Sequence, residues 1–206
     1  MNIKTKQNTE KAILDAAKKI FLEKGFASTS TTEIAKKVGC NQAMVHYYFR
    51  TKERLFEEVF ADKFQEFVSN LLEITDGDLS FEEKIQLKIE THFDMLLENP
   101  KFPMLFAYEM NTNPKRLEEI KLKLGSQSAS VFTNLQAELD AEFEKGKIRK
   151  MKVIDLLFSI ISLNMTLFII GPVLKAFSGF SDEYYQGFVK HRKKENVNTI
   201  LSSLRL

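Results

Sequence analysis

The chain has 206 residues and a formal net charge of +2; 44% of its residues are hydrophobic and 28% are charged. This composition is that of a globular protein and excludes an intrinsically disordered chain. The single cysteine, Cys40, excludes an intramolecular disulfide and leaves no Cys/His set for a structural zinc site.

The first predicted helix covers residues 9–24, where Ile13, Ala17 and Ile20 recur at spacings of three and four and Gly25 follows as a stop. The hydroxyl-rich stretch STSTTE then offers N-caps to a short helix over residues 33–38, which ends at Gly39. A tight turn, CNQ, leads into a third helix with the sequence QAMVHYYF.

Longer amphipathic or apolar segments follow, and they are separated by the few glycines and prolines of the chain. We expect helices over residues 52–72, 81–99, 114–124, 126–145, 152–177 and 182–204, with Ser80 as the N-cap of the helix over residues 81–99 and a short segment, MLFAYEMN, after Pro103. Gly125 is expected to kink or interrupt the helix there. Strand-like alternation is absent from the sequence. The pattern therefore predicts an all-α fold.

A short second helix joined by a tight turn to a third is the pattern of a helix-turn-helix DNA-binding unit. Val45 and Phe49 supply the buried side of the third helix, which leaves Gln42, Ala43, Met44, His46, Tyr47 and Tyr48 facing outward. Glutamine can contact adenine, and the alanine and methionine can pack on thymine methyl groups. Taken alone, the same residues also fit an ordinary three-helix core in which the tyrosines only pack.

Charge agrees with a DNA-binding first part. Residues 1–56 carry eleven Lys and Arg against five Asp and Glu, so the rest of the chain is mildly acidic. Tyrosine hydroxyls, His46 and Lys52 can reach phosphates, and the hydroxyls and backbone N–H groups around Thr31 and Thr32 can hold another phosphate. An anionic partner is therefore expected at the N-terminal part.

The order of residues in GFASTSTTEIAKKVGCNQAMVHYYFRTKERLF resembles the N-terminal domain of the tetracycline-repressor (TetR) family, and AILDAAKKIFLEKGF upstream fits as well. The positions that carry the resemblance are Gly25, Phe26, Thr29, Ile34, Ala35, Gly39, His46, Tyr47, Tyr48, Phe49, Lys52, Glu53 and Leu55. Three residues depart from the family pattern: Cys40 stands for the usual Val, Asn41 for Ser and His46 for Tyr. The asparagine remains a suitable N-cap.

The resemblance implies a helix-turn-helix domain over residues 1–55 and a larger helical domain over residues 56–206 that binds a small effector and forms a homodimer. It implies a cytoplasmic transcriptional regulator, a repressor released from a near-palindromic double-stranded DNA operator. The positions it assigns to DNA contact are Thr31, Thr32, Gln42, Ala43, Met44, Tyr47, Tyr48 and Lys52, with His46 at the place of a phosphate-contacting tyrosine. The alternative is a DNA binder whose second domain only dimerises or binds a partner.

The second domain is rich in Phe and Met, which suit a pocket for an uncharged or amphipathic effector. Candidate pocket residues are Phe64, Phe67, His92, Met95, Phe106, Tyr108, Phe132, Asn134, Phe158, Ser162 and Met165. A well-filled core would use the same side chains. No cofactor or metal is expected, because no phosphate-cradling loop or ligand pattern occurs, and no catalytic constellation argues for an enzyme.

The stretch LLFSIISLNMTLFIIGPVL, residues 156–174, contains no charge and is long enough to cross a bilayer. A membrane-attached helical protein is therefore a rival interpretation. Asp155, Ser159, Ser162 and Thr166 recur at spacings of four, three and four and form a polar stripe. This stripe favours burial in the protein and its partner subunit, and the polar N-terminus, MNIKTKQNTEK, does not have the apolar core of a secretory signal.

Overall fold

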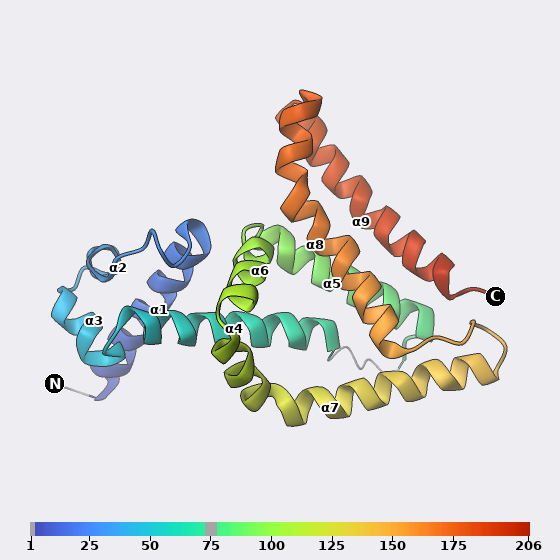
Figure 1. Ribbon diagram of the computed structural model, residues 1–206, viewed down its shortest axis with the longest axis horizontal. Helices are drawn as coiled ribbons and strands as arrows, with labels where there is room; N and C mark the ends of the chain where they lie inside the picture. The colour runs from blue at the N-terminus through green and yellow to red at the C-terminus, as the bar shows by residue number, and fades with distance from the viewer. Residues whose placement is uncertain (1–2, 73–77) are drawn as a thin grey trace. The chain divides into compact units, whose positions relative to one another are not determined.

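The computed structural model describes residues 3–72 and 78–206, and over these residues it contains nine α-helices and no strand (Figure 1). The helices are α1 (Ile3–Lys24), α2 (Thr31–Val38), α3 (Gln42–Phe49), α4 (Lys52–Leu72), α5 (Phe81–Glu98), α6 (Phe102–Thr112), α7 (Pro114–Glu144), α8 (Val153–Ser178) and α9 (Asp182–Leu204). The predicted all-α fold is confirmed.

Two helices differ from their predicted extent by more than two residues or in continuity. Helix α1 begins six residues before Thr9, where the sequence is polar and carries no periodic signal. Helix α7 runs through Gly125 without a break, so the predicted interruption there was wrong. A glycine costs a helix interior only about 1 kcal/mol relative to alanine, which the rest of a 31-residue helix readily offsets.

Contacts divide the chain into two compact units. One comprises the chain up to residue 65 together with residues 108–120, and the other comprises residues 66–107 and 121–206. The division falls inside α4, α6 and α7 and not in a linker. The predicted domain boundary between residues 55 and 56 stays a prediction.

The first unit is built on the packing of α1, α2 and α3 against one another. Its buried side chains come from all three helices and from the start of α4: Ile13, Ala17, Phe21, Ile34, Ala35, Val45, Phe49, Leu55 and Phe56. Phe21 and Phe56 meet edge to face with ring centroids 4.9 Å apart, and Phe26 lies 5.1 Å from Phe56. Because α2 and α3 have eight residues each, this shared core and not intrinsic propensity holds them helical.

The second unit buries its main cluster between α5, α7, α8 and α9, and α8 and α9 run side by side (Figure 1). The cluster consists of Ile85, Ile89, Leu135, Leu139, Ile148, Met151, Leu156, Leu157, Ile160, Val197, Ile200 and Leu204. A smaller cluster of Phe93, Leu167 and Val189 continues it. The sequence of α8, apolar on most sides, is explained in part by this burial.

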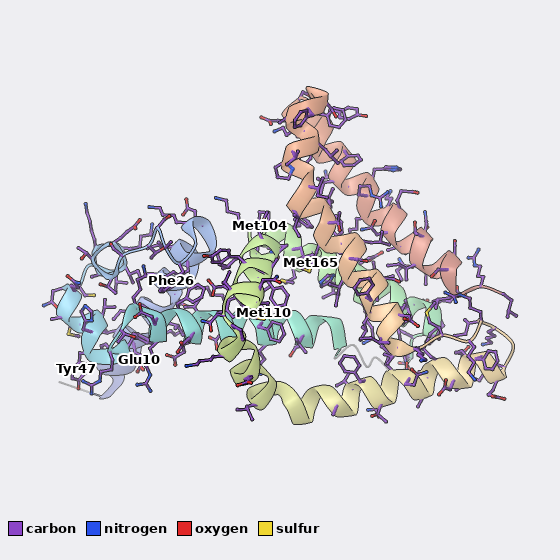
Figure 2. The ribbon with its side chains drawn as sticks, viewed as in Figure 1. Glu10, Phe26, Tyr47, Met104, Met110 and Met165 are labelled. Carbon is purple, nitrogen blue, oxygen red and sulfur yellow. The ribbon has the colours of Figure 1, made fainter. Side chains whose placement is uncertain are left out.

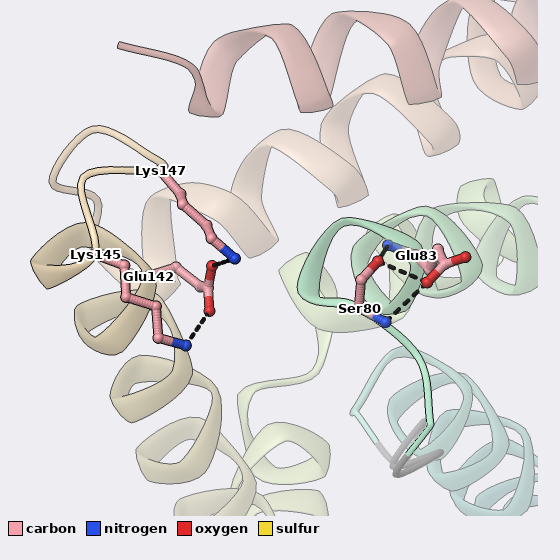
Figure 3. A network of polar contacts seen from close by, with 5 residues as sticks. All are labelled: Ser80, Glu83, Glu142, Lys145 and Lys147. Carbon is pink, nitrogen blue, oxygen red and sulfur yellow. Dashed lines mark hydrogen bonds and ion pairs between the residues drawn. The ribbon is translucent and has the colours of Figure 1, made fainter.

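Local polar contacts lie at the start of α5, where the predicted cap is confirmed, and at the end of α7. Ser80 caps α5: its hydroxyl accepts from the Glu83 backbone, and the Glu83 carboxylate accepts from the Ser80 backbone at 2.8 Å (Figure 3). At the end of α7, Glu142 pairs with Lys145 at 2.7 Å and Lys147 at 3.5 Å (Figure 3). The carboxylate and the two lysines at this turn are thus paired with one another.

A buried chain of polar side chains crosses the second unit from α9 through α8 to α5. Arg192 donates to the Asn196 side-chain oxygen (2.6 Å), Asn196 donates to that of Asn164 (2.8 Å), and Asn164 donates to His92 Nδ1 (2.9 Å). Asn164 also donates to the Ile89 carbonyl at 2.9 Å. His92, Asn164 and Asn196 are fully buried, and this burial lowers the pKa of His92 to about 4.

Candidate nucleic-acid interface

Helix α2 starts at a capped N-terminus. Ser30 is the N-cap, and its hydroxyl accepts from the Glu33 N–H at 3.1 Å. Thr29, which the family resemblance implies as the cap, is buried instead, and its hydroxyl donates to the Gly25 carbonyl at 2.8 Å. Thr31 is buried and Thr32 is exposed, so of these two threonine side chains Thr32 is the one that faces solvent.

The turn between α2 and α3 holds the third helix in place. Gly39 ends α2 with φ 78°, a left-handed conformation that favours glycine. Asn41 caps α3, and its side-chain oxygen accepts from the Met44 N–H at 2.9 Å, which confirms the cap expected from the sequence. Cys40 between them is half-buried and its backbone N–H donates to the Ala35 carbonyl.

Helix α3 has one buried and one outward side, as predicted. Val45 and Phe49 are 1% and 3% exposed and belong to the core. Outward residues are Gln42, Ala43, His46 and Tyr47, all exposed, together with the half-buried Met44 and Tyr48. Tyr47 is 53% exposed and meets the Tyr48 ring edge to face, with ring centroids 5.2 Å apart; Figure 2 labels Tyr47 on α3. The two adjacent rings thus form part of an accessible surface and not of the core.

The side chain of Gln42 connects α3 to the start of α2. Its Oε1 accepts from the Thr32 hydroxyl at 3.1 Å, and its Nε2 donates to the Thr31 hydroxyl oxygen at 3.0 Å. Its Nε2 also lies 3.3 Å from His46 Nε2. Four of the predicted DNA-contacting residues are therefore joined in one network, in which Gln42, Thr32 and His46 are exposed and Thr31 is buried.

Lys52, the first residue of α4, has contacts that the sequence did not indicate. Its ammonium donates to the Thr29 carbonyl at 2.7 Å and lies 4.3 Å from the centroid of the Phe26 ring. The residue thus ties the loop before α2 to α4 while it remains half-buried. A cation held at this place adds positive charge next to the α2 N-terminus.

The backbone conformation of Arg50, which directly follows α3, was not expected from the sequence. Arg50 has φ 62° and ψ −57°, and the Thr51 N–H donates to the Phe49 carbonyl at 2.6 Å, so residues 49–51 form a γ-turn. The turn brings the Arg50 carbonyl to 3.0 Å from His46 Nδ1. No local sequence signal marks a positive φ at an arginine, because such values favour glycine and asparagine.

The candidate effector residues occupy different environments. In the second unit, His92, Met95 and Met165 are buried, and Phe106, Phe132 and Ser162 are half-buried. Asn134 is exposed there and Phe158 is 71% exposed, so these two side chains face the surface of the isolated chain. Phe64 (half-buried) and Tyr108 (62% exposed) belong to the first unit, and the Phe67 side chain lies outside the described residues.

By length and composition α8 is apolar enough to cross a membrane, and among the described residues it is the one helix of this kind. Its buried residues Leu156, Leu157 and Ile160 belong to the main cluster of the second unit, as in the core helix of a globular protein. Helix length and apolarity therefore do not distinguish a membrane-spanning helix from a core helix.

Comparisons with known proteins agree with this geometry. Residues 13–59 match the sequence model described as bacterial regulatory proteins, tetR family. The fatty acid metabolism regulator protein of Bacillus subtilis is 23% identical over 148 residues, 72% of this chain and 75% of that protein. Among solved structures, the hemolysin II transcriptional regulator HlyIIR is 25% identical with a TM-score of 0.60, covering 98% of this chain and 99% of its own.

A TetR family transcription regulator from Marinobacter aquaeolei VT8 shares the fold over 99% of both chains, with a TM-score of 0.65 and 19% identity. The matched residues 13–59 contain α2, α3 and the turn between them, which are the elements that present the exposed face described above. The family is one of regulators and not of enzymes. Residues 13–59 thus form the DNA-binding domain shared with the tetR family of bacterial regulatory proteins, and the chain is a DNA-binding transcriptional regulator.

Proposed function

We propose that the chain is a cytoplasmic, homodimeric repressor that leaves its operator when a small apolar or amphipathic effector binds. The observation that carries the proposal is the outward face of α3, where polar and aromatic side chains are exposed on a helix anchored by Val45 and Phe49. An exposed face of this kind on a helix-turn-helix unit is suited to the major groove of DNA.

In this proposal α3 lies in the major groove and α2 lies against the DNA backbone. Gln42, Ala43 and Met44 face base edges, because they stand at the N-terminal end of the recognition helix. The α2 N-terminus with Thr31 and Thr32 holds a phosphate, since its leading N–H groups and the helix dipole favour an anion. Further phosphate contacts come from Tyr47, Tyr48 and Lys52, and they fix the register of the helix on the DNA.

The dimer is proposed to form through α8 and α9 as a four-helix bundle. Large apolar side chains of α8 are exposed in the isolated chain, among them Ile154, Phe158, Val173 and Phe177, and a partner copy would cover them. A twofold dimer presents two recognition helices about 34–36 Å apart, one turn of DNA, so the operator is expected to be a near-palindrome.

The effector is proposed to be uncharged or amphipathic. Support comes from the Phe- and Met-rich second domain, where Met95 and Met165 are buried and can adapt their shape to a ligand. The fatty acid metabolism regulator of Bacillus subtilis has a name that fits an apolar metabolite, which makes acyl compounds a reasonable first set to screen. Such a molecule regulates only if it binds the DNA-competent and incompetent dimers with different affinity.

The proposal is tested with the full-length protein and DNA selected from a random pool. We expect enrichment of a near-palindromic sequence, a dimer by light scattering, and release of that DNA by members of an apolar ligand set in a mobility-shift assay. A monomeric protein would refute the assembly. Release by phosphorylated metabolites alone would overturn the effector class while leaving the DNA-binding function intact.

A further inference from the structure

The hydrogen-bond directions on the α3 surface follow from one fixed acceptor. The Arg50 carbonyl oxygen can only accept, and it lies 3.0 Å from His46 Nδ1. The proton of the neutral imidazole must therefore be on Nδ1. The other ring nitrogen, Nε2, then has a lone pair and acts as an acceptor.

This ring nitrogen in turn sets the orientation of the Gln42 amide. His46 Nε2 lies 3.3 Å from the Gln42 nitrogen and accepts one of its two hydrogens. The second hydrogen is donated to the Thr31 hydroxyl oxygen at 3.0 Å. Turning the amide over would place its oxygen against His46 Nε2, two acceptors facing each other, so the observed orientation is the one that the network permits.

The exposed end of Gln42 is consequently an acceptor and not a donor. Both amide hydrogens are engaged, whereas the oxygen accepts one bond, from Thr32 at 3.1 Å, and keeps a second lone pair. A bidentate contact to adenine, the expectation from the sequence, needs a free N–H to donate to N7 as well as the oxygen to accept from the amino group. Because the network uses both amide hydrogens, no free N–H is left to donate to adenine N7.

We propose that Gln42 reads its base pair through Oε1 alone and selects a base with an exocyclic amino group, adenine or cytosine, over guanine or thymine. The keto oxygens of guanine and thymine would face the Gln42 oxygen acceptor to acceptor. This inference rests on the proposed placement of α3 in the major groove. His46 and the Arg50 carbonyl are positioning groups that act through Gln42.

The backbone at Arg50 agrees with such a role. A γ-turn with positive φ at a non-glycine residue is strained and persists where the surrounding structure enforces it. Here it brings the carbonyl onto the ring that orients the recognition side chain. Strain at this position is thus coupled to the DNA-facing surface and not to the core.

The test is selection from a random DNA pool with the full-length wild type, Gln42→Ala and His46→Ala. The base position that loses its preference in Gln42→Ala identifies the contacted pair. At that position we expect the wild type to accept adenine and cytosine within about twofold and to disfavour guanine and thymine by about threefold to tenfold. His46→Ala frees one amide hydrogen, so adenine should then exceed cytosine by about tenfold.

Three further measurements separate this role from a structural one. Arg50→Gly keeps the carbonyl and removes the steric penalty of the positive φ, so it should preserve the wild-type base preference. Long-range ¹⁵N–¹H spectra of the neutral His46 ring should place its proton on Nδ1. His46→Phe, which also lacks a ring nitrogen, should reproduce the preference of His46→Ala, and circular dichroism checks that every variant is folded.

Three outcomes would overturn the inference: a wild type that prefers adenine to cytosine by about tenfold or more, an adenine-to-cytosine ratio unchanged in both His46 variants, or a proton on Nε2. If Gln42→Ala alters no base preference at any position, the placement of α3 in the groove fails, and the reading through Gln42 fails with it. The experiment thus distinguishes a wrong docking from a wrong direction of hydrogen bonding.

Discussion

Replacing His92 tests how strongly the second unit depends on a neutral, buried imidazole. The ring is fully buried and its Nδ1 accepts from Asn164, and burial lowers its pKa from 6.5 to about 4. Between these two pH values the unfolded chain binds a proton that the folded chain does not. The contribution of the neutral His92 ring to the free energy of unfolding is therefore fully present above about pH 6.5, and it is lost progressively as the pH falls toward 4.

The size of the effect follows from the difference between the two pKa values. A fall from 6.5 to about 4 corresponds to about 3 kcal/mol of unfolding free energy, since each pH unit of difference is worth about 1.4 kcal/mol. His92→Gln removes the titrating ring and keeps an amide that can accept from Asn164. We expect the variant to be less stable than the wild type at pH 7.5 and to lose less stability on acidification.

Chemical denaturation at pH 7.5, 6 and 5, at one fixed protein concentration because a dimer's stability depends on it, measures this difference. His191→Gln, which removes an exposed imidazole from α9, controls for the loss of one histidine. Comparing variants at each pH cancels the titration of the carboxylates that both share. Parallel pH profiles for wild type and His92→Gln would refute the reasoning.

Three further substitutions test the packing, a cap and the DNA surface. Gly171→Ala would put a methyl group against the Tyr185 hydroxyl, so the Tyr185 side chain or the helix that carries it must move. Thermal unfolding should show a loss of about 1–3 kcal/mol, which Tyr185→Phe in the same chain should partly restore. Ser80→Ala should cost about 1 kcal/mol in the same assay, whereas Glu83→Gln should keep the capping box. Lys52→Ala should weaken binding to operator and random DNA alike and reduce its salt dependence in titrations, and a loss confined to the operator would contradict a phosphate role.

The helix-turn-helix unit was readable from the sequence because its signals are local. Hydroxyl and asparagine caps at Ser30 and Asn41 and a glycine at Gly39 mark the ends of α2 and the start of α3, and each acts within a few residues. Apolar spacing then separates the buried side of α3 from its outward side. The contacts among the outward residues were not readable, because they depend on how α2 and α3 meet in space.

The dependence of contacts on how helices meet in space also limits what the sequence predicts about the second unit. Asn164 and Asn196 are polar residues within apolar helical faces, a pattern that indicates buried partners without naming them. Phe158 is of a residue type expected in an apolar pocket, and yet its side chain is mostly exposed. Apolar residues that face a partner subunit and those that line a cavity cannot be distinguished in a sequence. The candidate pocket therefore stays a prediction, whereas the DNA-facing helix has a described geometry.

Two histidines of the chain are set in opposite tautomers by groups that have only one hydrogen-bonding role. At His46 the acceptor-only carbonyl of Arg50 holds the proton on Nδ1 and leaves Nε2 to accept from Gln42. At His92 the series of hydrogen bonds starts from the donor-only guanidinium of Arg192 and passes through Asn196 and Asn164. His92 Nδ1 therefore accepts, and the ring proton is on Nε2.

Protonating His92 on Nδ1 would require both asparagine amides to turn over. Turned over, Asn196 would offer its amino group to the Arg192 guanidinium, donor against donor. The network therefore acts in the same direction as burial and keeps the ring neutral. In both units a terminal group with a single role, and not the charge of the ring, determines what the histidine offers to its neighbours.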